Sequence, residues 1–541
     1  MYFSEFIKKH SAAFSLLLLA VLVIAVYVRT LKFDYVNFDD QILVLHNYEF
    51  ISDYKNIPQA FKKTVFNSLY GDSYYRPVLT LSFAACAITG GKNPFVYHLG
   101  NLLLHLAAVF LFFAFLKITK RPDIFIFLFT ALFAVHPALA PAVAWIPGRN
   151  DILLAIFCFA SLLSLFYFFE DGKKSVVKFA VFALALFAAF LTKETSVVVL
   201  LVIPFFMYAF CNNAERKDYV YVMLASVFFA AVYMFIRNAV MFGTSNTELS
   251  LDRLPNAVQA LKVLAVYCGY SVIPASGKMY FDTVSVDFMA LFSCVFTAVV
   301  LACSLVFNIG RRKVVLFGFA WFVLFLLPLL FHLGTPSNNW LSHRLYCPAA
   351  GAALMFMEFF SALSERFDAY KKYLISLLFC LIILFAFAAG IQSGKFENKL
   401  VFISNALEEQ PDSEMLRLKL AQYYAESGML DKAKYEIYGI KTKDNLHTPK
   451  YYDILGYILC LEGEYSGAVD IFEQLLKINP DSESALSNLC EIYLRTGDYD
   501  KARGYAEMLV KIRPDISAYR DKLKTAELKV KNSEAQRLKD N

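Results

Sequence analysis

Charged residues are scarce in this chain of 541 residues: they make up 18% of it, whereas a soluble domain averages about 25%. The hydrophobic fraction is 58%, Phe alone contributes 54 residues, and the mean hydropathy is +0.50. This composition excludes a disordered protein and a wholly soluble enzyme. It predicts a polytopic membrane protein.

Several other features are missing. The net charge is only +6 and no part of the chain has the dense basic face that nucleic-acid binding needs, so we expect no nucleic-acid partner. The ten cysteines form no Cys-x-x-Cys pair and no Cys/His spacing typical of a metal site. We therefore predict no metal ligands among them.

The remaining charge is unevenly distributed and divides the chain near residue 394. Residues 1–394 carry 51 charged side chains, about 13%, whereas residues 395–541 carry 47, or 32%. The two parts have net charges of +9 and −3. We expect an all-α polytopic membrane domain over 1–394 and a soluble domain over 395–541.

A bilayer core takes about 20 apolar residues per helix, and eleven runs in the first part are candidates. The first follows Lys8 and Lys9 and resembles a signal peptide, but no small-residue cleavage site follows it, so we expect an uncleaved anchor. The runs are approximately 11–28, 95–117, 122–136, 151–170, 176–192, 195–211, 219–240, 286–309, 314–333, 346–362 and 373–390.

Lys and Arg accumulate in cytoplasmic loops, and they set the predicted orientation. A twelfth apolar run, 256–273, breaks the pattern if it crosses, because residues 311–313 would then face outward. We therefore expect 256–273 to be a surface or re-entrant helix on the outer side, and the C-terminal tail to lie outside as well. With the N-terminus inside, the inner loops contain Lys117, Lys120, Arg121, Lys173, Lys174, Arg216, Lys217, Arg311, Arg312, Lys313, Lys371 and Lys372.

The soluble tail contains an internal repeat with steps of 34 and 35 residues. Small Ala residues let paired helices approach closely and Gly permits the turn between them, so the pattern resembles tetratricopeptide repeats, which form an α-solenoid. We expect residues 517–540 to form a capping helix. Such an array usually binds peptides or proteins, although it can also be a spacer. The repeating residues are Gly428, Gly463 and Gly497, and Ala433, Ala468 and Ala502.

Ionisable side chains beside membrane spans are costly and mark candidate sites. In the predicted topology the unusual ones all lie in outer loops. The first outer loop contains Asp39 and Asp40. Two adjacent carboxylates repel each other, so one can act as a general base, or the pair can hold a divalent metal. An isolated Asp-Asp pair is otherwise a helix cap or part of a solvated loop.

Other outer segments add polar candidates. Arg76 ends the first outer loop, and His98, Asn101 and His105 are spaced so that they share one face of the next helix. That face either lines a polar cavity or forms interhelical hydrogen bonds. The later outer loops contribute His136, Arg149, Asp151, Lys193, Glu194, His343 and Arg344.

Three of these later residues are cations suited to an anionic group. The planar guanidinium of Arg149 fits phosphate, Lys193 can make a phosphate contact, and Arg344 is the best candidate for the anionic group of a lipid phosphate. The alternatives are an interfacial ion pair of Lys193 with its neighbour Glu194, and anchoring of Arg344 at the membrane interface. Asp151 can instead cap the following helix.

These motifs occur in one order that resembles a known family. The chain is similar to the transmembrane-and-tetratricopeptide-repeat O-mannosyltransferases and their bacterial relatives, which belong to the GT-C superfamily of polytopic glycosyltransferases. The resemblance covers nearly the whole chain, including the repeats. It rests on Phe38-Asp39-Asp40, Tyr75-Arg76-Pro77, Asn101 with His105, Val135-His136-Pro137, Gly148-Arg149 with Asp151, Lys193-Glu194, and the run Arg344-Leu345-Tyr346-Cys347-Pro348.

The resemblance implies a function and a mechanism. GT-C enzymes take a sugar, here mannose, from a polyprenyl-phosphate carrier on the side of the membrane away from the cytoplasm, with inversion at the anomeric carbon. It implies that Asp39 or Asp40 removes the proton from the acceptor hydroxyl. Arg344, with Arg149 and Lys193, would neutralise the departing phosphate.

The resemblance also implies the partners. The donor is a lipid-linked sugar held among membrane lipids, no metal is needed because cations take the phosphate, and a divalent metal at the Asp pair is the alternative. The repeats would recruit an acceptor protein or peptide. No Asn-x-Ser/Thr acceptor and no C-terminal retention signal occur, so we expect a bacterial inner membrane with a periplasmic site, the alternative being the lumenal face of the endoplasmic reticulum membrane.

Three rival functions remain open at this point. A GT-C transferase acting on a lipid-linked glycan or lipopolysaccharide shares every membrane motif, and only the repeats favour a protein acceptor. A membrane-anchored repeat scaffold has no need for carboxylates and cations in several outer loops. A transporter would place its charges near the midplane, whereas these lie at the ends of spans.

Overall fold

The computed structural model describes residues 11–36, 38–66, 74–170, 174–241, 257–273, 286–330, 342–440 and 447–540. Lys8, Lys9 and Lys173, which helped to set the predicted orientation, lie outside these residues. The described part is helical and contains no strand, which confirms the expected all-α class. It forms two compact units, Met1–Phe402 and Ile403–Asn541, so the first unit extends eight residues past the predicted boundary at 394.

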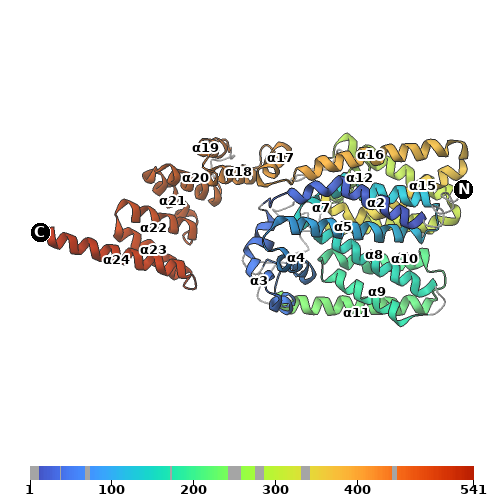
Figure 1. The fold of residues 1–541 in the computed structure, drawn as a ribbon, viewed down its shortest axis with the longest axis horizontal. Coiled ribbons are helices and arrows are strands. Elements are labelled where there is room, and N and C mark those ends of the chain that lie inside the picture. The colour runs from blue at the N-terminus through green and yellow to red at the C-terminus, as the bar shows by residue number, and fades with distance from the viewer. Residues whose placement is uncertain are drawn as a thin grey trace. The chain divides into compact units, whose positions relative to one another are not determined.

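The first unit is a bundle of helices (Figure 1). Its α-helices are α2 Ser11–Tyr27, α3 Tyr48–Ser52, α4 Pro77–Gly90, α5 Pro94–Lys117, α6 Asp123–Ala134, α7 Ala140–Ala144, α8 Arg149–Glu170, α9 Val176–Phe190, α10 Val199–Phe210, α11 Arg216–Met241, α12 Ala257–Val272, α13 Phe288–Phe307, α14 Arg312–Leu330, α15 Tyr346–Arg366 and α16 Lys371–Gly394. Short turns of helix join them: η1 Val28–Lys32, η2 Gln41–His46, η3 Tyr54–Phe61, η4 Pro137–Leu139, η5 Ile146–Gly148, η6 Glu194–Val198, η8 Ile309–Arg311, η9 Ser342–Leu345 and η10 Asp368–Tyr370.

Eight helices in the described residues are long and apolar enough to cross a membrane, and a bent pair makes a ninth candidate. This is the character of a multi-pass membrane protein. The predicted spans at 176–192 and 195–211 correspond to the shorter apolar helices Val176–Phe190 and Glu194–Phe210. The run at 256–273 forms α12, a short helix that packs against α13, α14 and η9.

The predicted span at 122–136 does not continue as one straight helix. It ends at Ala134, and the chain turns by 46° before it continues through Pro137–Ala144. Pro137 and Pro141 each lack a backbone N–H and crowd the preceding turn, which accounts for the break. The bend places η4, α7 and η5 across one end of the bundle.

The loops separate into the two groups that the charge pattern predicts. At one end, Lys117 pairs with Asp123 at 2.6 Å and Lys120 with Glu170 at 3.4 Å. The opposite end carries α3 and α4 (Figure 1), and there Arg76 pairs with Glu194 and Lys193 with Asp151. The grouping of loops is therefore confirmed by contacts that the sequence did not specify.

The interior of the bundle is built from aromatic rings and close glycine contacts. Phe112 lies 4.5 Å from Phe133 between ring centroids, and Trp321 stacks on Phe159 at 5.9 Å. Helices α14 and α15 meet at Gly318 and Gly351. A Cβ atom at Gly351 would lie 2.5 Å from the carbonyl oxygen of Gly318, so no side chain fits there.

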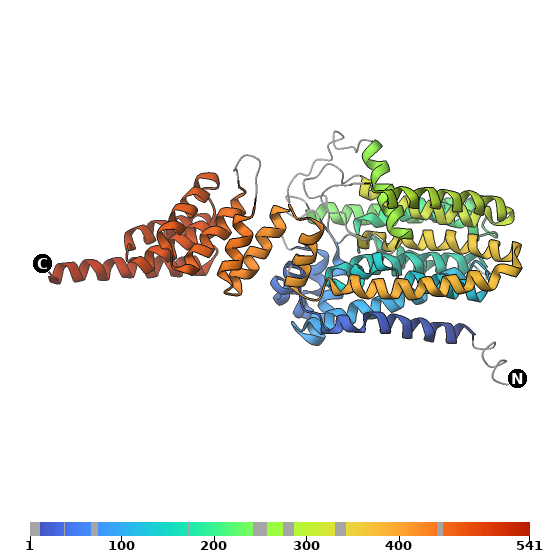
Figure 2. The same cartoon turned by 90° about the horizontal axis from the view of Figure 1, so that it is seen from above.

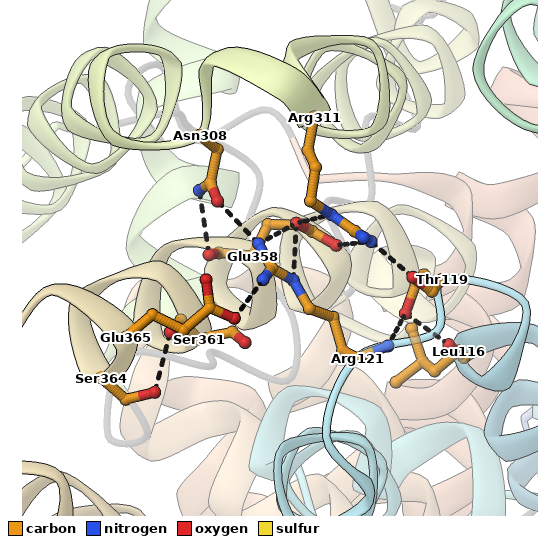
Figure 3. A network of polar contacts seen from close by, with 9 residues as sticks. All are labelled: Leu116, Thr119, Arg121, Asn308, Arg311, Glu358, Ser361, Ser364 and Glu365. Atoms are coloured by element: carbon orange, nitrogen blue, oxygen red, sulfur yellow. Dashed lines mark hydrogen bonds and ion pairs between the residues drawn. The ribbon is translucent and has the colours of Figure 1, made fainter. Parts of the chain in front are cut away.

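The inner end is closed by a network of polar contacts around one buried carboxylate (Figure 3). Glu358 on α15 has no exposed surface and accepts hydrogen bonds from Arg121 at 2.7 and 3.0 Å and from Arg311 at 2.9 Å to each oxygen. Asn308 accepts from Arg121 at 2.6 Å and donates to the backbone oxygen of Glu358 at 3.1 Å. Three distant segments are thus joined at one point.

The second unit is a stack of paired helices (Figure 2). The left-handed turns that the repeat needs are at Gly428, Gly463 and Gly497, whose φ angles are 75°, 82° and 88°. This confirms the repeat and the helix expected over 517–540. The helices are α17 Lys399–Glu409 at the junction, α18 Glu414–Glu426, α19 Leu430–Tyr438, α20 Pro449–Glu462, α21 Tyr465–Ile478, α22 Glu483–Thr496, α23 Tyr499–Ile512 and α24 Ser517–Asp540.

Replacing Glu358 should destabilise the first unit strongly. Glu358→Gln removes the charge that the buried Arg121 and the half-buried Arg311 share, and leaving a buried charge uncompensated costs about 3–5 kcal/mol. The control is Glu365→Gln, because Glu365 pairs with the same Arg121 but is 58% exposed, where an ion pair contributes about 0–1 kcal/mol. Thermal unfolding in detergent, followed by intrinsic fluorescence, checks both. Equal midpoints for the two variants would contradict a structural role for Glu358.

Gly351→Ala should lower the unfolding midpoint because the new methyl group collides with the backbone of α14. Overpacking of this kind typically costs about 1–3 kcal/mol. Gly390→Ala is the matched control, since Gly390 lies within helix α16 and a Cβ atom there meets nothing within 4 Å. The same thermal measurement applies, and the control is expected to unfold at or above the wild-type midpoint.

Candidate functional site

The outer end of the first unit brings together the polar residues of five separate segments. These segments are the loop after η1, the residues that precede α4, the start of α8, the connection from α9 to η6, and η9. Each lies at the end of an apolar helix, where a polar side chain can leave the bilayer core without breaking a span. The candidates fall into a carboxylate pair, a charged cluster and a set of packing residues.

The carboxylate pair divides into two different environments. Asp40 is buried, and its two oxygens accept hydrogen bonds from the backbone N–H groups of Val36 and Phe38, both at 2.7 Å. Its carboxylate therefore shapes the loop, as Asp side chains do in tight turns. Asp39 is only half-buried. The structure thus separates two neighbouring residues that the sequence left equivalent.

The charged cluster is centred on Asp151 and Lys193. The Lys193 ammonium lies 2.6 Å from Oδ1 of Asp151, and both side chains are buried. The other oxygen of Asp151 is 3.8 Å from Nε2 of His343. Asp151 follows Arg149 at the start of α8, where the helix dipole favours a negative charge. The pair Lys193–Asp151 joins two loops that are 42 residues apart in sequence.

A second ion pair flanks the first. Arg76 donates through Nε and a terminal nitrogen to one oxygen of Glu194, at 2.9 and 2.7 Å. The backbone N–H of Tyr75 donates to the other oxygen at 3.3 Å. The sequence suggested that Glu194 pairs with its neighbour Lys193. The structure instead pairs Glu194 with Arg76 and leaves Lys193 to Asp151.

The surroundings of Lys193 show how closely the cations gather. Burial lowers the pKa of its ammonium from the ordinary value, and Asp151 raises it. The positive charges of Arg76 and Arg344 lower it further. Three cations therefore act on one small region that holds two carboxylates, Asp151 and Glu194. The cluster has an excess of one positive charge.

Arg344 accounts for this excess. It is half-buried in η9. Within the part of the chain that the structure describes, no carboxylate lies within ion-pair distance of its guanidinium. An Arg side chain in this position has five N–H donors for an anion that is not part of the protein. The charge and position of Arg344 thus suit the phosphate contact that the sequence predicts for it.

A line of aromatic rings connects the carboxylate pair to the charged cluster. The ring of Phe38, beside Asp39, is 6.4 Å from that of Trp145, and the ring of Trp145 is 5.5 Å from that of His343. His343 then reaches Asp151. A continuous line of contacts therefore links the Asp pair to the cations, although different loops supply them.

Arg149 does not take the phosphate-binding position expected from the sequence. It is buried, and its N–H groups bond to Oδ1 of Asn101 at 2.8 Å, the carbonyls of Ser82 at 2.9 Å and Tyr97 at 2.7 Å, and the sulfur of Cys86 at 3.4 Å. Asn101 in turn donates to the carbonyl of Trp145 at 3.0 Å. Arg149 and Asn101 therefore hold the Trp145 loop in place and have a structural role.

The histidines of the predicted polar face also contact the protein itself. His105 lies 2.9 Å from the carbonyl of Ala134 through Nε2 and 2.6 Å from the Tyr346 hydroxyl through Nδ1. Because a carbonyl only accepts, Nε2 carries the proton and Nδ1 accepts from the hydroxyl. His98 is buried with its ring edge-on to Phe33 at 6.0 Å. This helix face therefore makes contacts with neighbouring segments of the protein, which is the second of the two alternatives that the sequence left open.

His136 lies at the break after α6 and supports α12. Its Nδ1 accepts from the backbone N–H of Ala138 at 3.2 Å, and its Nε2 is 3.4 Å from the carbonyl of Ser271. The ring also packs edge-on to Phe385 at 5.0 Å. These contacts give His136 a positioning role at the bend, next to the site but not within its charged cluster.

Sequence reasoning missed two features of the site. Trp145 was not among the predicted site residues, although the structure places it in the middle of the aromatic line. Tyr267 on α12 is fully buried and close enough to Arg344 and Asp151 to interact with their charges. A signal for Trp145 was present, since it is one of only three Trp residues and stands in a polar loop. No pattern in the sequence identified Tyr267.

Comparison with known proteins agrees with the repeats and with the family resemblance. Residues 459–526 match the family model described as Tetratricopeptide repeat. Protein O-mannosyl-transferase TMTC2 of Homo sapiens is 34% identical over 148 residues, which is 26% of this chain and 17% of that protein. Protein O-mannosyl-transferase Tmtc1 of Drosophila melanogaster is 29% identical over 187 residues, 34% of this chain and 21% of that protein.

A third relative shows the same pattern of partial coverage. Protein O-mannosyl-transferase TMTC3 of Homo sapiens is 31% identical over 130 residues, 23% of this chain and 14% of that protein. The matched stretches thus span about a fifth or less of these relatives. No solved structure matches the chain. The chain is related to the protein O-mannosyl-transferases, as its ordered motifs and repeat tail predict.

Proposed function

We propose that this protein is a membrane glycosyltransferase that moves a mannosyl residue from a polyprenyl-phosphate carrier to hydroxyl groups of exported proteins, with inversion. The reaction takes place at the outer end of the first unit, on the side of the membrane away from the cytoplasm. We place it in a bacterial inner membrane with the site and the repeats in the periplasm. The names of the relatives support the transferred sugar and the protein acceptor.

The observation that carries the proposal is the excess cation in the buried cluster. Among the described residues, Arg76 pairs with Glu194 and Lys193 with Asp151, whereas Arg344 has no carboxylate within ion-pair distance. A polyprenyl-phosphate sugar is a phosphodiester with a single negative charge, which this excess balances. When the bond to the sugar breaks, the phosphate gains a second charge, and fixed cations in a dry site stabilise that change.

The base is drawn from the carboxylate pair at the other end of the aromatic line. Both oxygens of Asp40 already accept backbone N–H groups, and we therefore assign to Asp40 the positioning of the loop. Asp39 is the general base that removes the proton of the acceptor hydroxyl. The hydroxyl oxygen attacks the anomeric carbon from the face opposite the phosphate, so the configuration inverts.

The repeat unit supplies the protein acceptor in this proposal. Tetratricopeptide repeats are arrays that bind polypeptide segments, and the match over residues 459–526 covers α21, α22 and α23 and parts of α20 and α24. A lipid-linked glycan would need no such unit. Because the cations take the phosphate, we expect no requirement for a divalent metal, and treatment with EDTA tests this expectation directly.

Arg344→Ala should lower the rate of transfer about 100- to 1,000-fold, the usual effect of removing one group that stabilises developing charge. Purified protein in nanodiscs, radiolabelled polyprenyl-phosphate mannose and a membrane-free extract of exported proteins provide the assay. Arg366→Ala is the control, because Arg366 is exposed at the far end of α15, the helix that directly follows η9 and Arg344. It should retain wild-type activity.

The assay also separates the rival functions. Label that moves to an added glycolipid but to no protein would contradict the protein acceptor and keep the transferase. An Arg344→Ala variant as active as wild type would contradict the phosphate site. No transfer from the carrier in the wild type would contradict the proposal as a whole.

The two aspartates should differ in what their loss affects. Asp39→Asn should lower transfer by about 100- to 10,000-fold, as expected for a general base, and should lower the unfolding midpoint less than Asp40→Asn does, because Asp39 is half-buried and Asp40 is buried. Asp40→Asn replaces an acceptor of a backbone N–H by an NH₂ group, so it should also lower the midpoint, by the equivalent of about 1.5–3 kcal/mol. Activity in Asp39→Asn, or loss of wild-type activity with EDTA, would contradict the assignment of the base.

A further inference from the structure

The region between the carboxylate pair and the cations has a chemistry of its own. We propose that Phe38, Trp145 and His343 form the subsite for the pyranose ring of the donor, in which the indole N–H of Trp145 and the second oxygen of Asp151 bind sugar hydroxyls. This inference rests on the proposed function and names the residues that select the sugar. Neither the family motifs nor the charged cluster assigns that role to any residue.

These rings lie between the proposed base and the cations, which is where the sugar must bind. The line of contacts runs from Phe38, beside Asp39, through Trp145 to His343, with ring centroids 6.4 and 5.5 Å apart, and on to Asp151 and Lys193. In a displacement with inversion, the sugar carbon stands between the base that activates the acceptor and the departing phosphate. The aromatic rings likewise lie between Asp39 and the cations.

Two buried polar atoms in this region lack a partner. Nε1 of Trp145 and Oδ2 of Asp151 are buried and form no hydrogen bond within the part of the chain that the structure describes. Such atoms are rare because burial without a hydrogen bond is unfavourable. The chain itself offers the contrast: Nε1 of Trp321, in the core, donates to the carbonyl of Cys347 at 2.7 Å.

The two unpartnered atoms restrict the chemistry of the ligand. One is a donor and the other is a carboxylate oxygen that only accepts. A lipid chain satisfies neither, and the oxygen of an ionised phosphate only accepts, so it cannot donate to the carboxylate oxygen. A hydroxyl group can both donate and accept, so a sugar satisfies both. The C–H groups on one face of a pyranose also pack on the negative face of an aromatic ring.

The backbone at Trp145 is held in position before any ligand binds. Asn101 donates to the Trp145 carbonyl at 3.0 Å, and Nε of Arg149 donates to Oδ1 of Asn101 at 2.8 Å. The turn after Trp145 is equally constrained, because a Cβ atom at Gly148 would lie 2.8 Å from the Cα atom of Ala142. This support preorganises the subsite, as a specific binding site requires.

The test compares the binding of two carriers, polyprenyl-phosphate mannose and polyprenyl phosphate without a sugar, to the full chain in nanodiscs. Trp145→Phe keeps the ring and removes the N–H donor. It should weaken the mannosylated carrier roughly 5- to 10-fold and leave the affinity for the bare carrier unchanged. Trp321→Phe is the matched control, because it removes the other buried indole donor, and it should leave the ratio of the two affinities unchanged. Arg344→Ala should weaken both carriers.

A second variant covers the case in which Trp145→Phe fails to fold, which the thermal midpoint reveals. Phe38→Leu removes a ring on the other side of Trp145, and it should lower the preference for the mannosylated carrier as well. Equal loss of both carriers in Trp145→Phe, or an unchanged ratio in both variants, would overturn the sugar subsite while the proposed transferase stands. Failure of the wild type to bind either carrier would overturn both.

Discussion

The fold depends on one buried carboxylate. Glu358 has no exposed surface and receives two arginines, Arg121 from the loop after α5 and Arg311 from η8 (Figure 3). A charge removed from water is tolerated only when it is paired and fully hydrogen-bonded, so these segments have one permitted arrangement. The consequence reaches the other end of the bundle, because α15 carries Glu358 near one end and follows directly on η9 at the other. The contact of Gly351 with α14 between these two points prevents the helix from sliding. The position of Arg344 is therefore set by packing and charge at a distance.

Buried charges need compensation at both ends of the bundle, but only one end supplies equal numbers of cations and carboxylates. At the inner end, Arg121 and Arg311 meet Glu358 and Glu365, and the charges balance. At the outer end, three cations meet two carboxylates. A balanced buried network is complete without a ligand, whereas an unbalanced one is completed by an anion from outside. This difference, and not the number of charged residues, distinguishes the structural network from the candidate site.

The sequence predicted the spans, the repeats and the grouping of loops because each depends on local patterns of hydropathy and spacing. It did not predict which charged residues pair, since pairing depends on contacts between distant segments. Arg149 and Arg344 both stand next to apolar runs, so the sequence does not distinguish them. Arg149 is buried and donates four hydrogen bonds within the protein. Arg344 has no carboxylate partner among the described residues. Glu358 lies within an apolar run and its structural role was not predicted, although a carboxylate buried there requires a cationic partner. The unit boundary at Phe402 was missed for a similar reason: residues after 394 look soluble, yet the backbone of Asp34 donates to Glu397 at 2.9 Å.

The proposed order of base, sugar and phosphate also explains why many residues with a positioning role surround the few that would take part in the reaction. Inversion requires the base, the sugar and the phosphate to stand in one order, and small displacements of reacting groups are costly in rate. Here the three positions come from different loops, so none is fixed by its neighbours in sequence. Asn101 and Arg149 fix the Trp145 loop, Asp40 fixes the loop of Asp39, and the Glu358 network fixes the helix that follows Arg344. In this proposal most of the polar residues that resemble a family signature hold a short line of groups in order, and few of them touch the substrate.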